Sequence, residues 1–207
     1  MDARSAGRAG ILIFVGAMEF AFFFVLAEIY YPGYSVSTNF ISDLGATCAS
    51  SCQFVQPSSM LFNTSITILG LLLLGSSLYL WKGFRSKMLT IFAVGSGIGS
   101  LGVGVFNESF GSIHGNFSSL TFLSIGIFAV FAYRFVKPPM SYFSIVAGVI
   151  ALTAAVLYGS KIYLGLGAGG MERMVVYPVL LWGIGFGGYL MAIAQAARYS
   201  EPAVTGR

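Results

Sequence analysis

The chain has 207 residues, of which 57% are hydrophobic and only 9% are charged, and its mean hydropathy is +0.84. Soluble domains carry about 25% charged residues, so this composition excludes a core surrounded by water and indicates one membrane domain over residues 1–207. The net charge is +4. The basic residues lie in short hydrophilic breaks between apolar segments and do not form the aromatic and basic surface that nucleic acid needs, which excludes nucleic acid as a partner.

Six apolar segments have close to the roughly 20 residues that a helix needs to cross a bilayer. Lipid leaves the backbone groups of an open strand unpaired, so the segments must be helices. The first is too long for a signal peptide and lacks a small-x-small cleavage site. The sequence therefore predicts an all-α, six-span membrane protein with spans at about 10–31, 58–81, 88–106, 117–135, 142–160 and 174–196.

The first predicted span contains two carboxyl groups, Glu19 near its middle and Glu28 near its outer end. A charge inside a membrane is costly, so such groups usually face the interior of the bundle. We expect Glu19 to bond with Asn63 or with a serine of another span. The alternative is that Glu19 and Glu28 carry protons or cations in a transporter.

The loop after this span contains the stretch "NFISDLGATCASSC" at residues 39–52. Its first part predicts a short amphipathic helix capped by Ser37 or Thr38. In such a helix Asn39 and Asp43, four residues apart, point to the same side, close to Ser42. Asp43 is then a candidate acid or base, or else it caps a helix or pairs with Arg173.

Cys48 and Cys52 lie in the same loop. An exported loop sits where disulfides persist, so we predict a structural disulfide. The C-x-x-x-C spacing differs from the C-x-x-C of thiol oxidoreductases. A quinone-linked redox role and a metal-bound pair remain as alternatives.

The small residues of the later spans indicate close helix contacts. Gly95 and Gly99 lie four residues apart on the third span, as do Gly183 and Gly187 on the sixth. We predict that these positions pack helices, and a channel lining is the alternative.

The second outer loop, "FNESFGSIHGNFSS", holds Asn107, Glu108 and the single histidine of the chain, His114. Histidine carries protons near neutral pH and binds metals. Since the acids around His114 lack a diagnostic ligand spacing, we predict a hydrogen-bonded histidine, with no metal and no other cofactor. Asn107 and Asn116 also begin N-x-S sequences that could be glycosylated.

The third outer loop brings Lys161, Glu172 and Arg173. The planar guanidinium of an arginine can clamp a phosphate or a carboxylate. The interpretations of Arg173 are therefore an anion anchor, or an internal ion pair with Glu172 or Asp43. The stretch "LGLGAGG" is not a phosphate-binding loop, because no strand precedes it and no Walker lysine follows it.

The distribution of basic residues predicts the orientation, because cytoplasmic loops are rich in Lys and Arg. With the N-terminus inside, only Lys161 and Arg173 fall outside. The other side carries Arg4, Arg8, Lys82, Arg85, Lys87, Arg134, Lys137, Arg198 and Arg207. We therefore expect both termini in the cytoplasm of a cell-membrane protein, and its polar loops on the extracytoplasmic side.

The stretches "YPGYSVSTNFISDLGA", "FNTSITILG", "FNESFGSIHGNFSSLTF" and "ERMVVYPVLLWGIGFGGYLM" resemble a family of small six-span membrane proteins of bacteria and archaea. That family is a domain of unknown function, with N-x-I-S-D-L-G as its most specific element. The resemblance implies six helices with polar motifs at one membrane face. The chain is more distantly similar to DRAM/Sfk-type proteins and to membrane hydrolases of the ceramidase type, which hold zinc with several histidines. Asp43 and His114 are the two residues of this chain that the resemblance to these hydrolases marks as candidate site residues.

We expect the outer loops to form a pocket that binds or processes a membrane lipid or a small polar ligand, with Asp43 or His114 as the acid or base. The expected pocket consists of Asn39, Ser42, Asp43, Asn107, Glu108, His114, Glu172 and Arg173. The alternatives are the transporter and a non-catalytic accessory subunit or scaffold of a membrane complex. A homo-oligomer formed through the glycine faces is also consistent with the sequence.

Overall fold

Six long helices form the protein in the computed structural model, which describes residues 1–48 and 51–200. They are α1 (Ala3–Ile29), α2 (Ser58–Phe84), α3 (Lys87–Val105), α4 (Ser112–Ala132), α5 (Met140–Gly159) and α6 (Gly167–Ser200). All six are long and apolar enough to cross a membrane. The predicted all-α, six-span fold is confirmed.

The connections contain only short elements. Three are 3-10 turns, η1 (Ser42–Leu44), η2 (Glu108–Phe110) and η3 (Tyr133–Phe135). Two are strands, β1 (Thr47–Cys48) and β2 (Cys52–Gln53), which pair antiparallel with Cys48 opposite Cys52.

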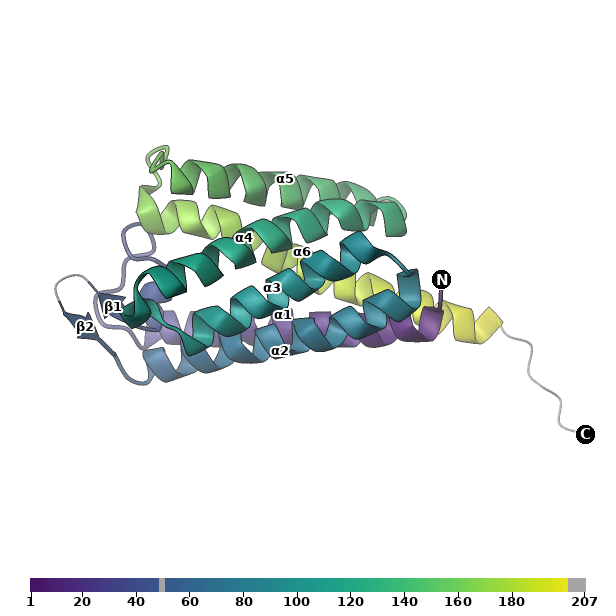
Figure 1. The fold of residues 1–207 in the computed structure, drawn as a ribbon, viewed down its shortest axis with the longest axis horizontal. Coiled ribbons are helices and arrows are strands. Elements are labelled where there is room, and N and C mark those ends of the chain that lie inside the picture. Colours follow the sequence, from purple (N-terminus) through teal and green to yellow (C-terminus); the bar gives the residue numbers. More distant parts are fainter. Residues whose placement is uncertain (49–50, 201–207) are drawn as a thin grey trace, which may run out of the picture.

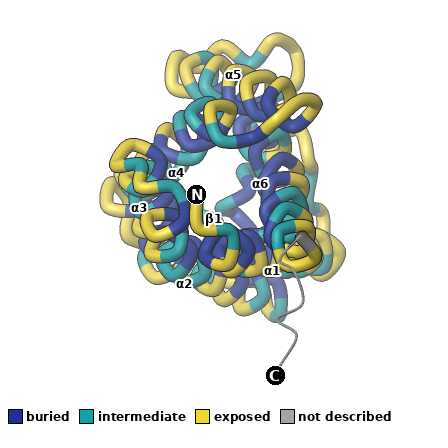
Figure 2. Tube along the Cα trace, turned by 90° about the vertical axis from the view of Figure 1, so that its right-hand side faces the viewer, coloured by how far each residue is buried: buried dark blue, intermediate teal, exposed yellow. Residues whose placement is uncertain are grey.

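Each helix packs against the next in the chain, and α6 packs against α1, which closes a ring (Figure 1). The view along the bundle places α5 outside α4 and α6, while the other five helices surround the centre (Figure 2). The chain starts at one end of the bundle, and α6 finishes there, so we call this the terminal end. The opposite end, which carries β1 and β2, we call the hairpin end.

Three helices begin earlier than predicted. α1 begins at Ala3 because the Asp2 side chain accepts hydrogen bonds from the first backbone amides. α4 begins at Ser112, so that His114 lies on a helix rather than in a loop. α6 begins at Gly167, where the Ser37 carbonyl accepts bonds from Gly169 N and Gly170 N.

The prediction of a short helix after the first span is wrong. Residues 32–41 form turns and bends, followed only by η1. Polar side chains compete with helical bonding here: Asn39 Oδ1 accepts from Ser35 N, and Asp43 Oδ2 accepts from Phe40 N. Ile41 and Leu44 are nevertheless buried, as their apolar character requires.

Glycines allow the closest helix contacts, as predicted. A Cβ atom on Gly187 would lie 2.7 Å from the Gly10 carbonyl oxygen of α1, and one on Gly70 would lie 2.8 Å from the Gly97 carbonyl oxygen of α3. These positions hold α6 against α1 and α2 against α3. Large apolar side chains such as Phe22, Leu71 and Leu181 instead face outward, as a lipid-exposed surface requires.

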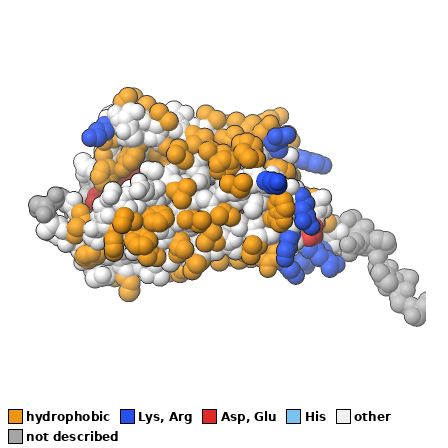
Figure 3. Space-filling view, in the orientation of Figure 1, with side chains coloured by type: hydrophobic (Ala, Val, Ile, Leu, Met, Phe, Trp, Pro, Cys, Tyr) orange, Lys and Arg blue, Asp and Glu red, His pale blue; other side chains and the backbone are white. Residues whose placement is uncertain are grey.

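Basic side chains concentrate at one end. Most of the Lys and Arg side chains visible in Figure 3 lie at the terminal end, and acidic side chains are visible at the hairpin end beneath α5. Arg207, one of the basic residues behind the predicted orientation, lies outside the described residues. Which end faces the cytoplasm stays a prediction.

Candidate functional site

The loop between α1 and α2 folds over the hairpin end and is fastened to the first turns of α2. Ser58 Oγ donates to the Leu44 carbonyl, and Ser59 Oγ to the Gly45 carbonyl. Asn63 Nδ2 also donates to Gly45 O, at 3.1 Å. Asn63 therefore holds the loop that carries Asp43.

Within this loop Asn39 and Asp43 do lie together, as predicted. Asn39 Nδ2 donates to Asp43 Oδ2 at 3.0 Å, and the backbone amide of Phe40 donates to the same oxygen at 2.8 Å. Asp43 is 8% exposed. Its carboxylate fixes the turn that places Phe40 and Ser42.

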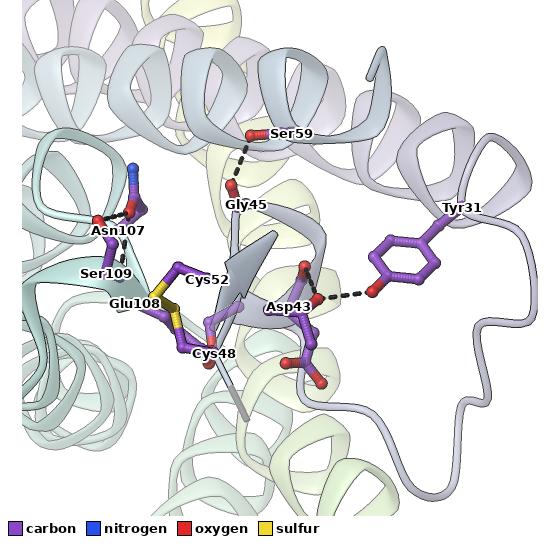
Figure 4. Close-up of a disulfide and its surroundings, with 11 residues drawn as sticks. Tyr31, Asp43, Gly45, Cys48, Cys52, Ser59, Asn107, Glu108 and Ser109 are labelled. Atoms are coloured by element: carbon purple, nitrogen blue, oxygen red, sulfur yellow. Dashed lines mark hydrogen bonds between the residues drawn. A yellow bond between two sulfur atoms is a disulfide. The ribbon is translucent and has the colours of Figure 1, made fainter. Parts of the chain in front are cut away.

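The predicted disulfide between Cys48 and Cys52 is present and joins β1 to β2. Figure 4 shows it beside Glu108 of η2. The hydroxyl of Thr47, next to the disulfide, donates to Asp43 O and accepts a 2.6 Å bond from the Tyr31 hydroxyl. The disulfide thus tightens the hairpin that packs against η2.

Glu108 is half-buried, and its Oε1 accepts a hydrogen bond from Ser42 Oγ. Burial raises the pKa of Glu108 to about 7. The Ser42 hydroxyl opposes this rise, and the nearby Asp43 carboxylate adds to it. The Glu108 carboxyl group therefore exchanges its proton near neutral pH.

His114 is buried in the first turn of α4 and is hydrogen-bonded, as predicted. Its Nδ1 donates to the Phe106 carbonyl at 2.8 Å. Nε2 then accepts from Ser118 Oγ at 3.3 Å. This pair of contacts selects one neutral tautomer and leaves Nε2 as the basic atom.

Glu172 and Arg173 are adjacent on α6 but contact different groups. Glu172 is 5% exposed, and its Oε2 accepts from the Ile41 backbone amide at 2.6 Å. This bond fastens the start of α6 to the loop between α1 and α2.

Arg173 is 3% exposed and is directed into the α1–α2 loop. Its Nη2 contacts Glu28 Oε1 and the Tyr34 hydroxyl, each at 2.6 Å. Its Nη1 donates to three backbone carbonyls, those of Val36, Asn39 and Gly169. The internal pairing was expected, but the predicted partners Glu172 and Asp43 are wrong, because Glu28 at the end of α1 lies nearer.

A cavity of about 350 Å³ opens between the loops, α4, α5 and α6 at the hairpin end, and we call it the polar cavity. Its polar lining includes Ser42, Glu108, His114, Ser118, Tyr158 and Glu172. Ligand pockets commonly measure about 300–1,000 Å³, so the polar cavity has the size of a small ligand site.

A narrower cavity of about 100 Å³, the apolar cavity, lies in the centre of the bundle among α1, α2, α3, α4 and α6. The two cavities share Ser42, Ser118, Phe122 and Glu172 as lining residues, so they adjoin. A polar chamber at the hairpin end therefore borders an apolar one in the interior.

Other predicted site residues lie apart from the polar cavity. Asn107 caps η2, where its Oδ1 accepts from Ser109 N and Ser109 Oγ. Glu28 is committed to Arg173. The expected bond between Glu19 and Asn63 is wrong: both carboxyl oxygens of Glu19 are buried without a hydrogen-bond partner among the described residues.

Sequence reasoning missed Phe40, Ser118, Phe122 and Tyr158. Ser118 follows His114 by one helical turn, a spacing that could have signalled the contact. Tyr158 lies at the end of an apolar span. Because tyrosine is common at membrane interfaces, nothing in the sequence indicated that Tyr158 lines the cavity. In the part of the chain that the structure describes, no group of three or more His, Cys, Asp or Glu side chains is placed to hold a metal ion.

The fold and this cavity define a multi-pass membrane protein with a polar chamber at one end of a helical ring. The chain belongs to the family described as "Protein of unknown function (DUF998)", whose model matches residues 14–189. No curated protein and no solved structure matches the chain.

Proposed function

We propose that this protein binds an amphiphile at the hairpin end, with the polar head group in the polar cavity and the start of the apolar chain in the apolar cavity. The observation that carries the proposal is that the two chambers share four lining residues, Ser42, Ser118, Phe122 and Glu172. Because the Glu172 carboxyl group lies between a polar and an apolar chamber, the site suits a ligand that has a polar head group and an apolar chain.

The spacing of α4 and α5 supports a lateral entrance. The two helices meet closely where a Cβ on Gly148 would lie 2.7 Å from the Gly126 carbonyl oxygen. Toward the hairpin end they diverge (Figure 1), and Gly115 and Gly159, which line the polar cavity, have no atom within 4 Å of their Cβ positions. An amphiphile would enter through this divergence, which we call the α4–α5 gap.

The positive-inside rule places the hairpin end, and with it the site, in the outer leaflet. Mild reduction of intact cells followed by a membrane-impermeant maleimide should then label Cys48 and Cys52. Labelling that occurs only after the cells are opened would place the site on the cytoplasmic side.

If the bound molecule is also processed, His114 is the proposed proton acceptor, because Nδ1 is occupied by Phe106 O and Nε2 lies at the polar cavity. Asp43 acts through the loop, by holding the turn that places Ser42. Arg173 has an internal role and is not an anion anchor in this proposal, because both terminal nitrogens contact the protein.

The transporter hypothesis finds less support. It needs Glu19 and Glu28 to exchange cations, but the Glu28 carboxylate is bound to Arg173 at 2.6 Å. An accessory subunit without a ligand gives no reason for two adjoining chambers. We therefore retain amphiphile binding as the proposed function.

Photolabelling with dodecyl chains that carry a diazirine near the head group tests the proposal. Three probes with a trimethylammonium, a hydroxyl or a sulfate head are used in turn, in maltoside micelles. We expect at least one to label residues that line the two cavities. Gly159→Trp, which fills the α4–α5 gap, should reduce this labelling roughly fivefold, an effect of about 1 kcal/mol.

The control is Val156→Trp on the same helix, where Val156 is 64% exposed. This variant should leave labelling of the cavities unchanged. If all three probes label only the lipid-facing surface, or if Gly159→Trp has no more effect than the control, the protein does not bind an amphiphile at this site.

A further inference from the structure

Aromatic rings form one wall of the polar cavity. The Tyr158 ring of α5 contacts the Phe40 ring edge-to-face at a centroid distance of 6.0 Å, and the Phe122 ring of α4 at 6.2 Å. All three residues line the cavity. Three segments far apart in the sequence thus bring their rings to one place.

The rest of the lining supplies carboxyl groups. Glu108 and Glu172 both line the cavity, and Glu172 is 5% exposed. His114 lines it as well, with Nδ1 donating to Phe106 O and Nε2 accepting from Ser118 Oγ. A group that enters this cavity therefore meets two carboxyl groups and a neutral imidazole.

Positive charge is absent from the same lining. No Lys or Arg occurs among the described residues that form the cavity. Arg173, the nearest cation along α6, is directed the other way, toward Glu28, Tyr34 and backbone carbonyls. The lining therefore holds no cation that would compete with a bound ammonium group for the two carboxyl groups.

We propose that the polar cavity recognises an ammonium head group, so that the bound amphiphile is an alkylammonium compound. This inference rests on the proposed function and narrows it to one class of ligand. The faces of aromatic rings attract ammonium ions, each contact contributing about 0.5–2 kcal/mol. Carboxylates repay the cost of removing the cation from water, whereas an anionic head group would find repulsion and no partner.

An organic cation fits these groups better than a metal ion. Within residues 1–48 and 51–200, no three His, Cys, Asp or Glu side chains converge as metal ligands. The aromatic wall offers a metal ion no ligand atoms, but it offers an ammonium group with attached carbons both apolar contact and ring faces.

The three dodecyl probes described above also test this inference. After normalisation to labelling of the lipid-facing surface, the trimethylammonium probe should label the cavities roughly tenfold more than the sulfate probe. Choline chloride, which carries the same head without the chain, should compete with the trimethylammonium probe, whereas sodium chloride at the same concentration should not.

Matched variants test whether the aromatic wall and the Glu172 carboxyl group cause the preference for the trimethylammonium probe. Tyr158→Leu and Glu172→Gln should each lower trimethylammonium labelling roughly fivefold, while Tyr158→Phe, which keeps the ring, should not. Hydroxyl-probe labelling of the same Tyr158→Leu and Glu172→Gln samples should stay at the wild-type level, which shows that the chamber is still formed.

Two outcomes overturn the inference and leave amphiphile binding intact. One is sulfate or hydroxyl labelling of the cavities that equals or exceeds trimethylammonium labelling. The other is trimethylammonium labelling that Glu172→Gln and Tyr158→Leu do not change. Labelling of the cavities by none of the three probes instead contradicts the proposed function itself.

Discussion

Two polar clusters lie side by side at the hairpin end and start from adjacent residues of α6. In the Arg173 cluster, which we call closed, the two terminal nitrogens of the guanidinium make five hydrogen bonds to Glu28, Tyr34 and three backbone carbonyls, while the buried Nε has no partner among the described residues. The Glu172 cluster is open, because its carboxyl group has one backbone partner and otherwise borders the two cavities.

The difference shows how one helix supports both a scaffold and a site. Consecutive residues of a helix point about 100° apart, so one side chain can fasten the loop while its neighbour reaches the chamber. Buried ionisable groups alone do not indicate function, since ion-paired structural networks also contain them. The arrangement of their partners separates the two roles.

The largest effect should come from breaking the closed cluster. Arg173→Met leaves Glu28 without its cation and leaves three carbonyls without a donor, so we expect a loss of about 3–5 kcal/mol in the free energy of unfolding. Denaturation of the purified protein in mixed micelles measures this loss. Glu172→Gln is the matched control and should lose less than about 1 kcal/mol, since an amide oxygen can still accept from Ile41 N. Equal losses in the two variants would remove the distinction between the clusters.

A smaller effect should separate two tyrosines, one from each cluster. The Tyr34 hydroxyl donates to Phe40 O at 2.8 Å and accepts from Arg173, whereas Tyr158 contacts Phe40 and Phe122 through its ring. Tyr34→Phe should therefore cost about 2 kcal/mol of unfolding free energy, and Tyr158→Phe should cost less than about 0.5 kcal/mol. The same denaturation measurement compares them, and a costly Tyr158→Phe would place Tyr158 in a scaffold role.

A third effect concerns pH and the open cluster. Because burial raises the pKa of Glu108 to about 7, the folded protein holds this proton more tightly than the unfolded chain does. The contribution of Glu108 to stability is therefore present below the ordinary carboxyl pKa and is lost as the pH rises through about 7.

Glu108→Gln should remove this loss. From about pH 5 to about pH 8, the unfolding free energy of the variant should improve relative to that of the wild type. Ser42→Ala removes the hydrogen bond that lowers the Glu108 pKa, so the loss should extend to higher pH in that variant. Parallel pH profiles for the wild type and Glu108→Gln would show that Glu108 does not titrate in this range.

The sequence predicted the elements that depend on composition over many residues. Six apolar stretches gave the six helices, and small residues such as Gly187 marked the closest contacts. The loop disulfide also followed from two nearby cysteines. These features depend on local patterns that a single sequence contains.

The site depends on contacts across the fold, and there the prediction was incomplete. Asn39 and Asp43 do lie together, but through turns rather than a helix. Arg173 pairs with Glu28, a residue 145 positions away, and spacing cannot reveal such a partner. Tyr158 looked like an ordinary interfacial tyrosine because its ring contacts with Phe40 and Phe122 exist only after α5 packs.

The close contact of α4 and α5 at Gly126 and Gly148 has a mechanical consequence. The two helices touch there and diverge toward the hairpin end (Figure 1). The size of the residues at this contact therefore sets the separation of α4 and α5. A large side chain at position 126 or 148 would push the helices apart along their whole length and change the angle at which they diverge.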